Sequence, residues 1–310
     1  MVKADIAIGG YFGMDPGTGA SDLPNGILLN SGRNALRHIV RMLGIKRIHV
    51  PHYICPVVAD ALDAEHCELL RYALTDDMLP AEIFPKNDYV LYVNYFGVCG
   101  LKVDRLASLY PKLIVDCAQA YFAKPKGLAS CASPRKFFGV PDGGVAFGVE
   151  AATYDEDGSD ARKEYLLERR DNGATPRGYE LFHRAEASLD NAEVLAMSQF
   201  TKTCLSKVDS RFAKKRRMEN FAYLQACLPT SFPLAMADDD VPMVYPYMMD
   251  DPQLRTRLIQ QKIYVASYWP GVQNCGDLPE RILPLPIDQR YGETDMQRIV
   301  EAIISQGEGV

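Results

Sequence analysis

The sequence predicts an α/β protein in which a mostly parallel sheet is flanked by helices and followed by a small C-terminal α+β domain. Two observations favour this class. Short apolar stretches of strand length alternate with segments of helical periodicity over the first half of the chain. The strongly β-prone stretch DYVLYVNYF at 88–96 is typical of a strand covered on both faces, as in a parallel sheet.

The first half of the chain contains most of the predicted sheet. Residues 1–26 are rich in Gly, Pro and Asp, and we expect an irregular lead-in. The first helix should be capped by Ser31 or Asn30 and end at Gly44. Strands are predicted at 27–29, 47–50, 68–73, 88–96, 113–115 and 145–147, and helices at 35–43, at 53–64 after Pro56, and at 103–109.

The second half predicts a different organisation. Residues 151–190 are highly charged, and we expect a flexible loop with one helix at 160–170. One or two long helices follow within 186–228. The small domain should have strands at 243–249, 264–269 and 282–286 and helices at 252–261 and 294–306. We therefore expect a large domain with its lead-in at 1–190, and a long helix with the small domain at 191–310.

Composition excludes several classes of function. A net charge of −6 argues against a general nucleic-acid binder, and the basic run RFAKKRR at 211–217 is interpreted as a solvated or interface-facing helix side. None of the eight cysteines forms a CxxC pair, so we expect reduced thiols and no zinc site. The N-terminus lacks the apolar core of a signal peptide, and no apolar run is long enough to span a bilayer. We expect a cytoplasmic protein.

Lys136 is the first candidate for chemistry. Six residues separate it from a Gly-Gly pair, after which a short apolar strand begins. A lysine next to a tight turn can direct its amine into a cleft, where desolvation lowers its pKa and makes it a nucleophile. Most lysines are solvated surface charges, so Lys136 needs support from other parts of the chain.

Two further features supply that support. Asp116 ends the buried strand at 113–115, and Gln119 follows three residues later. The turn at 32–34 opens a helix, whose free N–H groups can bind a phosphate. Taken separately, Asp116 could be a capping residue and the turn an ordinary capped helix. Together with Lys136 they match pyridoxal phosphate, which needs an anion seat, a carboxylate for its ring nitrogen and an amine for its aldehyde.

The chain also resembles the DegT/StrS-like family of fold-type-I pyridoxal-phosphate enzymes, which are mostly nucleotide-sugar aminotransferases. The resemblance rests on segments that occur in the family's order along most of the chain. The spacing from Lys136 to the Asp142-Gly143-Gly144 turn belongs to it. The other segments are SGRNAL, VPHYICPVVADAL, VNYFGVCG, LIVDCAQAYFAKPKG, YPYMM and KIYVASYWP.

The resemblance implies roles for individual residues. Lys136 would form a Schiff base with the cofactor and move protons, and Asp116 would pair with the pyridine nitrogen. Gln119 would lie near the ring or its 3-oxygen, and Tyr53 or Cys55 would cover the ring face. The phosphate ligands implied by the resemblance are Gly32, Arg33, Asn34 and Ser133.

Three features depart from the family pattern. Arg33 replaces the usual Thr or Ser, and Cys55 replaces the usual ring-stacking aromatic residue. No loop reaching the partner subunit's phosphate is recognisable between Asp171 and Asp190. The resemblance otherwise implies a homodimer that transfers an amino group, with glutamate as donor, to a keto-sugar nucleotide in surface polysaccharide or lipopolysaccharide biosynthesis. Neither a nucleic acid nor a membrane is expected as a partner.

Two alternatives stay open. The first is another pyridoxal-phosphate reaction, either a dehydratase or an aminotransferase for a non-sugar ketone; family dehydratases carry histidine in place of the lysine, so Lys136 argues against the dehydratase. The second is a binding or assembly protein that has kept the fold and lost the activity.

Overall fold

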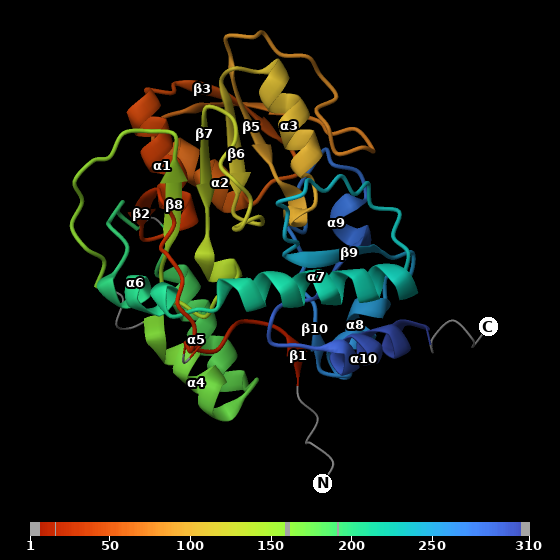
Figure 1. Ribbon diagram of the computed structural model, residues 1–310. Coiled ribbons are helices and arrows are strands. Elements are labelled where there is room, and N and C mark those ends of the chain that lie inside the picture. The colour runs from red at the N-terminus through yellow and green to blue at the C-terminus, as the bar shows by residue number, and fades with distance from the viewer. Residues whose placement is uncertain (1–6, 16, 159–161, 191, 305–310) are drawn as a thin grey trace.

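The protein is organised around one seven-stranded sheet. The structure, a computed structural model, describes residues 7–15, 17–158, 162–190 and 192–304. The strand order is β2-β8-β7-β6-β5-β3-β4 (Figure 1). The bounds are β2 Ile27–Leu29, β3 Arg47–Pro51, β4 Glu68–Tyr72, β5 Tyr89–Val93, β6 Leu113–Cys117, β7 Ala129–Ala132 and β8 Gly144–Phe147. Pairings from β4 through β7 are parallel, and β8 is antiparallel to both of its neighbours, which confirms the mostly parallel sheet.

Helices α1 (Gly32–Leu43), α2 (Pro56–Asp63) and α3 (Gly100–Leu109) accompany this sheet, close to their predicted positions. Of the two predicted caps, Ser31 is the one that caps α1, since its Oγ accepts a hydrogen bond from the backbone N–H of Asn34 at 3.2 Å. Gly44 ends α1 with φ +60°, the left-handed conformation that glycine adopts without a steric penalty. Helix α1 packs against β7 and β8, and its N-terminus lies beside Ser133, which follows β7, and Gly144, which begins β8.

The charged stretch after the sheet differs from the prediction of a loop with one helix. It folds into two helices that pack on each other, α4 (Glu164–Asn172) and α5 (Pro176–Ala187). Thr175 caps α5, and Pro176 occupies its first turn, where a missing N–H costs nothing. The start of the predicted helix at 160–170 lies partly outside the described residues.

The long helical region contains two helices, α6 (Gln199–Ser206) and α7 (Ser210–Cys227), and α7 runs along the small domain (Figure 1). That domain pairs β9 (Val244–Met248) with β11 (Ile282–Pro286) in antiparallel register. Its helices are α8 (Leu254–Gln260), α9 (Leu278–Arg281) and α10 (Glu293–Ile304). The predicted boundary at residue 190 stays a prediction.

The lead-in is the second correction to the prediction. Within it, β1 (Ile8–Gly9) pairs in parallel with β10 (Ile263–Tyr264) of the small domain. Where a strand was predicted at 264–269, the structure has only the two-residue strand β10. Trp269 has φ +58°, which lies outside the extended region. The backbone N–H of Gly9 also donates to the hydroxyl of Tyr291 at 2.7 Å, so the first described residues are fastened to the last part of the chain.

The described helices include none that has both the length and the apolar character needed to cross a membrane.

Candidate active site

A cavity of about 1040 Å³ lies at the carboxyl ends of the parallel strands, between the sheet, the α4–α5 pair and the small domain. In parallel sheets this edge is where ligands collect. Most of the residues singled out in the sequence line it together. They are Gly32, Arg33, Cys55, Asp116, Gln119, Ser133 and Lys136.

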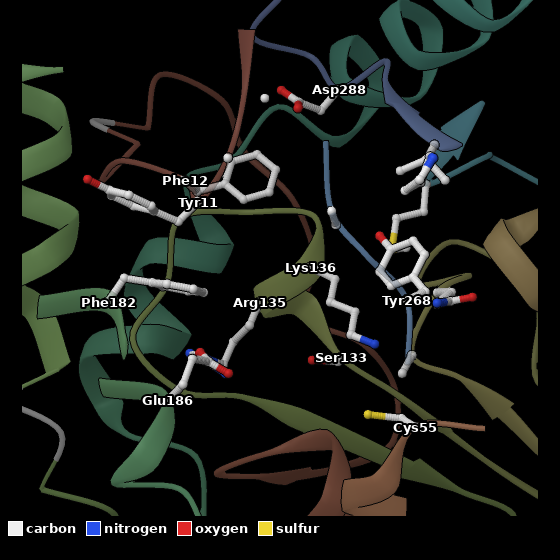
Figure 2. A pocket seen from close by; sticks show the side chains of 18 of the residues that line it. Tyr11, Phe12, Cys55, Ser133, Arg135, Lys136, Phe182, Glu186, Tyr268 and Asp288 are labelled. Atoms are coloured by element: carbon white, nitrogen blue, oxygen red, sulfur yellow. Dashed lines mark hydrogen bonds and ion pairs between the residues drawn. The ribbon is translucent and has the colours of Figure 1, made fainter. Parts of the chain in front are cut away.

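Lys136 ends a short 3₁₀ helix, Pro134–Lys136, which begins two residues after β7. Figure 2 shows its side chain extending into the part of the cavity that Ser133 and Cys55 also border. The turn beyond the lysine is fixed by Asp142, which is fully buried and accepts hydrogen bonds from both the backbone N–H and the hydroxyl of Ser198 at 2.8 Å. A buried, fully bonded carboxylate of this kind holds the loop that carries the lysine in one position.

The start of α1 and the residue three positions before the lysine lie in contact. A Cβ atom built on Gly32 would lie only 3.2 Å from the Cβ of Ser133. The N–H groups of the first turn of α1 and the Ser133 hydroxyl therefore border the same space. Free N–H groups at a helix start, with a hydroxyl beside them, form a natural seat for an anion.

Asp116 lies at the end of β6, 6% exposed, on the cavity wall. Burial raises the pKa of its carboxyl, while the positive charge of Lys136 and the backbone N–H of Ala118 oppose the shift. The Oδ1 atom accepts that N–H at 2.8 Å and the Cys131 thiol at 3.9 Å. Since both bonds go to Oδ1, Oδ2 is available for a cationic or N–H group of a ligand.

Gln119 provides a second unused polar atom. Its Oε1 accepts the backbone N–H of Phe96 at 2.9 Å, which fixes the side chain. Its Nε2 is buried and has no hydrogen-bond partner within the described part of the chain. A buried unpaired amide N–H costs free energy, and a ligand with an acceptor oxygen in this place would recover it.

Two predicted residues are not brought to the cavity. Asn34, in the first turn of α1, is fully buried, and its Nδ2 donates to Asn30 and to the backbone oxygen of Glu193, both at 2.8 Å. Tyr53 is also buried, and its ring stacks on Tyr95 with 5.7 Å between centroids. Of the two residues expected to cover a ring face, Cys55 alone lines the cavity.

Several wall residues carried no signal in the sequence reading. Arg135, next to the lysine, forms an ion pair with Glu186 at the end of α5 (Figure 2). Tyr268 also lines the cavity (Figure 2). The Asp288–Arg290 pair, with 2.7 Å between Oδ1 and Nε, lines the opposite wall.

Arg211, Lys214 and Lys215 of the basic run are exposed, as the interpretation of a solvated or interface-facing helix side expects, but Arg217 departs from it. The residue is fully buried, lines the cavity and donates through Nη1 to the carbonyl of Met243 at 2.9 Å, whereas Arg211 is exposed. A signal for this was present, because Arg217 falls at helical spacing between the apolar Ala213 and Phe221, on the side of α7 that faces the core.

The cavity is basic although the protein is acidic. Among the described residues that line it, seven are Arg or Lys and three are Asp or Glu, in a chain of net charge −6. Such a concentration of positive charge in a cleft favours anionic ligands. An amine, a buried carboxylate, an unpaired amide N–H and an anion seat meet in this cavity, and these groups fit pyridoxal phosphate.

Comparison with known proteins gives the same fold. No family model and no curated protein matches the chain. Among solved structures, Helicobacter pylori PseC, an aminotransferase involved in the biosynthesis of pseudoaminic acid, has a TM-score of 0.65 at 13% identity, over 93% of this chain and 88% of that one. A DegT DnrJ EryC1 StrS aminotransferase from Brucella abortus has a TM-score of 0.61 at 16% identity, over 92% and 86% of the two chains.

A third structure is the PLP-form of Spr1654, a putative sugar aminotransferase from Streptococcus pneumoniae. It has a TM-score of 0.63 at 12% identity, over 96% of this chain and 93% of that one. At these identities the likeness shows the fold, which is that of the fold-type-I aminotransferases and confirms the predicted fold class.

Proposed function

We propose, from a fold shared with the sugar aminotransferases, that this chain is a pyridoxal-phosphate-dependent aminotransferase with Lys136 as its catalytic lysine. The observation that carries the proposal is that Lys136, Asp116 and the anion seat at Gly32 and Ser133 border one cavity. The fold alone would not support it, because one fold hosts many activities. The proposal rests on the side chains that meet at the site.

Each of these residues would have a defined task. When bound, pyridoxal phosphate supplies an electron sink for the bonds of the substrate carbon. Asp116 would keep the ring nitrogen protonated, since a buried carboxylate with a raised pKa gains from a cationic partner. Lys136 would hold the cofactor and carry a proton to and from the substrate carbon. Gln119 would donate its unpaired Nε2–H to the 3-oxygen attached to the cofactor ring.

The substrate we propose is a keto-sugar nucleotide, with glutamate as the amino donor. The support is the size and charge of the cavity. About 1040 Å³ holds more than the cofactor, and the excess of basic residues suits a diphosphate and a dicarboxylate. This substrate would place the protein in surface polysaccharide or lipopolysaccharide biosynthesis.

A homodimer is part of the proposal, since aminotransferase sites of this fold form between two subunits. Sedimentation at several protein concentrations tests it. A monomer at micromolar concentration that still binds the cofactor covalently would contradict this part and leave the chemistry intact.

The direct test of the cofactor is borohydride reduction of the protein mixed with pyridoxal phosphate, followed by peptide mapping. The expected result is the cofactor mass on Lys136, with K136A unlabelled. Lys126, which pairs with Asp104 at 2.7 Å outside the cavity, offers a matched control in K126A. Labelling of K136A at wild-type level would overturn the assignment.

The reaction is tested by adding glutamate to the loaded protein and following its absorbance, and then by product analysis with a panel of ketones. Loss of the cofactor's lysine-bound absorbance on adding glutamate supports amino transfer and the donor together. Activity only on non-sugar ketones, or elimination of water instead of amination, would overturn the substrate or the reaction. A protein that stays colourless after the cofactor is added does not form the lysine-bound cofactor. That result would favour the alternative of a binding or assembly protein that has lost the activity.

A further inference from the structure

Glu186 lies among three positive side chains at the inner wall of the cavity. Its carboxylate forms an ion pair with Arg135, the residue before Lys136 (Figure 2). Burial by itself would raise the pKa of Glu186, but Arg135, followed by Arg33 and Lys136, outweighs it and leaves the pKa lowered. The position of this carboxylate is therefore one where the protein strongly favours a negative charge.

Arg33 belongs to the same arrangement. It follows Gly32 in the first turn of α1 and forms an ion pair with Asp190, which lies just beyond α5. Arg33 follows Gly32 and Arg135 lies two residues after Ser133, so each neighbours one of the groups that form the anion seat, and each pairs with an acid at or just beyond the end of α5. In the view of Figure 2, Ser133 lies between the Arg135–Glu186 pair and the amine of Lys136.

The two arginines differ from their acidic partners in burial. The side chains of Arg33 and Arg135 are 17% and 12% exposed, whereas those of Asp190 and Glu186 are 58% and 35% exposed. Arg135 also has a buried Nε without a hydrogen-bond partner among the described residues. The acids can thus turn into water more readily than the arginines, which stay in place and need an anion.

We infer that Arg135 and Arg33 bind the phosphate of the cofactor. Without the cofactor they pair with Glu186 and Asp190, whose carboxylates occupy the place of the phosphate and are exchanged for it when the cofactor binds. This inference rests on the proposed function for the identity of the phosphate compound. A phosphate monoester carries more charge than one carboxylate and presents three acceptor oxygens. Guanidinium groups bind a phosphate monoester through two parallel N–H donors. The phosphate can therefore displace a single carboxylate from each arginine.

The inference explains Arg33, which stands where the resembling family has Thr or Ser. A guanidinium beside the helix start supplies the charge that a hydroxyl cannot. It also gives α5 and the residues just beyond it a role, because they supply the carboxylates that pair with the two arginines until the phosphate binds. Both arginines come from the same chain as Lys136.

The test compares three ligands on the full chain: pyridoxal phosphate, inorganic phosphate and pyridoxal, which lacks the phosphate. Trp269 is the only tryptophan and lines the cavity, so its fluorescence reports binding without any turnover. E186Q removes a competing carboxylate and is expected to tighten binding of both phosphate compounds by about tenfold, with pyridoxal unchanged. R135Q is expected to weaken both by about tenfold, again with pyridoxal unchanged.

Two controls keep the result interpretable. E180Q neutralises an exposed acid on the same helix and should leave all three affinities unchanged. R135K retains the charge without the paired donors and should fall between wild type and R135Q, which separates phosphate binding from a defect in folding.

Weaker phosphate binding in E186Q would overturn the inference, since Glu186 would then be a structural partner. Equal losses for pyridoxal phosphate and pyridoxal in R135Q would also overturn it. If wild type binds inorganic phosphate as expected but never attaches the cofactor to Lys136, the proposed function fails and the anion exchange stands. If the cofactor attaches and neither variant changes its affinity, the inference alone fails.

Discussion

The guanidinium of Arg217 lies over the ring of Phe137, with 4.5 Å between its central carbon and the ring centroid. Phe137 directly follows the candidate catalytic lysine. Gln289 bridges the same two residues through hydrogen bonds. Its Oε1 accepts from Nε of Arg217 at 3.0 Å, and its Nε2 donates to the carbonyl of Phe137 at 2.7 Å. Helix α7 therefore supports the lysine loop from behind.

Replacing Arg217 by methionine should destabilise the protein by about 3 kcal/mol, because buried acceptors on Met243 and Gln289 lose their donor. Urea unfolding measures the loss. R211M removes an exposed arginine of the same basic run and should unfold like wild type. Equal midpoints for R217M and wild type would show that the buried contacts contribute nothing net.

Alkaline pH should unfold the protein through its buried tyrosines. Burial raises the pKa of Tyr72, Tyr92 and Tyr95 well above 10.0, and their hydroxyls donate to backbone carbonyls. A group with a higher pKa in the folded chain stabilises it fully below the unfolded value, and that stability is lost as pH rises through the folded value. The urea midpoint should therefore fall from about pH 10 upward.

Arg217 acts with the opposite sign, because burial lowers its pKa to about 10, so the free-energy penalty on its buried charge shrinks as pH rises above that value. One arginine does not offset three tyrosines. Y92F should make the fall in the urea midpoint shallower, and a midpoint that is flat across this range would contradict the prediction.

Asp116→Asn should separate cofactor attachment from catalysis. The asparagine keeps the shape of the side chain and cannot hold a proton on a ring nitrogen, so Lys136 should still be labelled after reduction. Amino transfer should slow by about 100-fold or more, a typical loss for a displaced proton-transfer partner. D60N, on exposed helix surface outside the cavity, provides the control. Single-turnover rates at wild-type level in D116N would refute the role of Asp116.

Gly144→Ala should disturb the fold at the anion seat. A Cβ there would overlap the carbonyl oxygen of Ser31 and lie 2.7 Å from the backbone nitrogen of Gly32, and backbone atoms cannot yield as a flexible side chain can. We expect a loss of about 3 kcal/mol in unfolding free energy. G158A places a Cβ in open space and should leave stability unchanged. Equal unfolding curves for the two variants would contradict the close approach.

The sheet and the lysine–carboxylate set were predictable because each depends on local pattern. The apolar stretch at 113–115 determines a buried strand, and Asp116 follows from its end. The wall residues were not predictable in the same way. Glu186 of α5 meets Arg135 of the 3₁₀ segment Pro134–Lys136 only in the folded chain, because 51 positions of sequence separate the two residues. The burial of Arg217 was hidden by its neighbours, since three adjacent basic residues indicate a solvated face until the helical stripe is traced.

The lead-in was misread for a related reason. A two-residue strand has too little periodicity to be recognised, and its partner lies in the small domain at Ile263–Tyr264. Tyr53 and Asn34 were placed at the cofactor from their neighbours in sequence. Their side chains instead turn to the core, where the Tyr53 ring stacks on Tyr95 and the Asn34 amide donates two hydrogen bonds; the buried Tyr53 hydroxyl has no hydrogen-bond partner among the described residues.

The pairing of β1 with β10 of the small domain also determines the order in which the parts of the site can form during synthesis. Gly9 and Gly10 border the cavity, and they are held there by Tyr264, Tyr291 and Arg290, near the end of a 310-residue chain. A ribosome releases the first of these segments long before the last. The lysine and its carboxylate can be in position before residues 263–291 are made, but this part of the cavity wall forms only after them. A chain that lacks residues 263–291 would therefore leave this side of the cavity open to solvent.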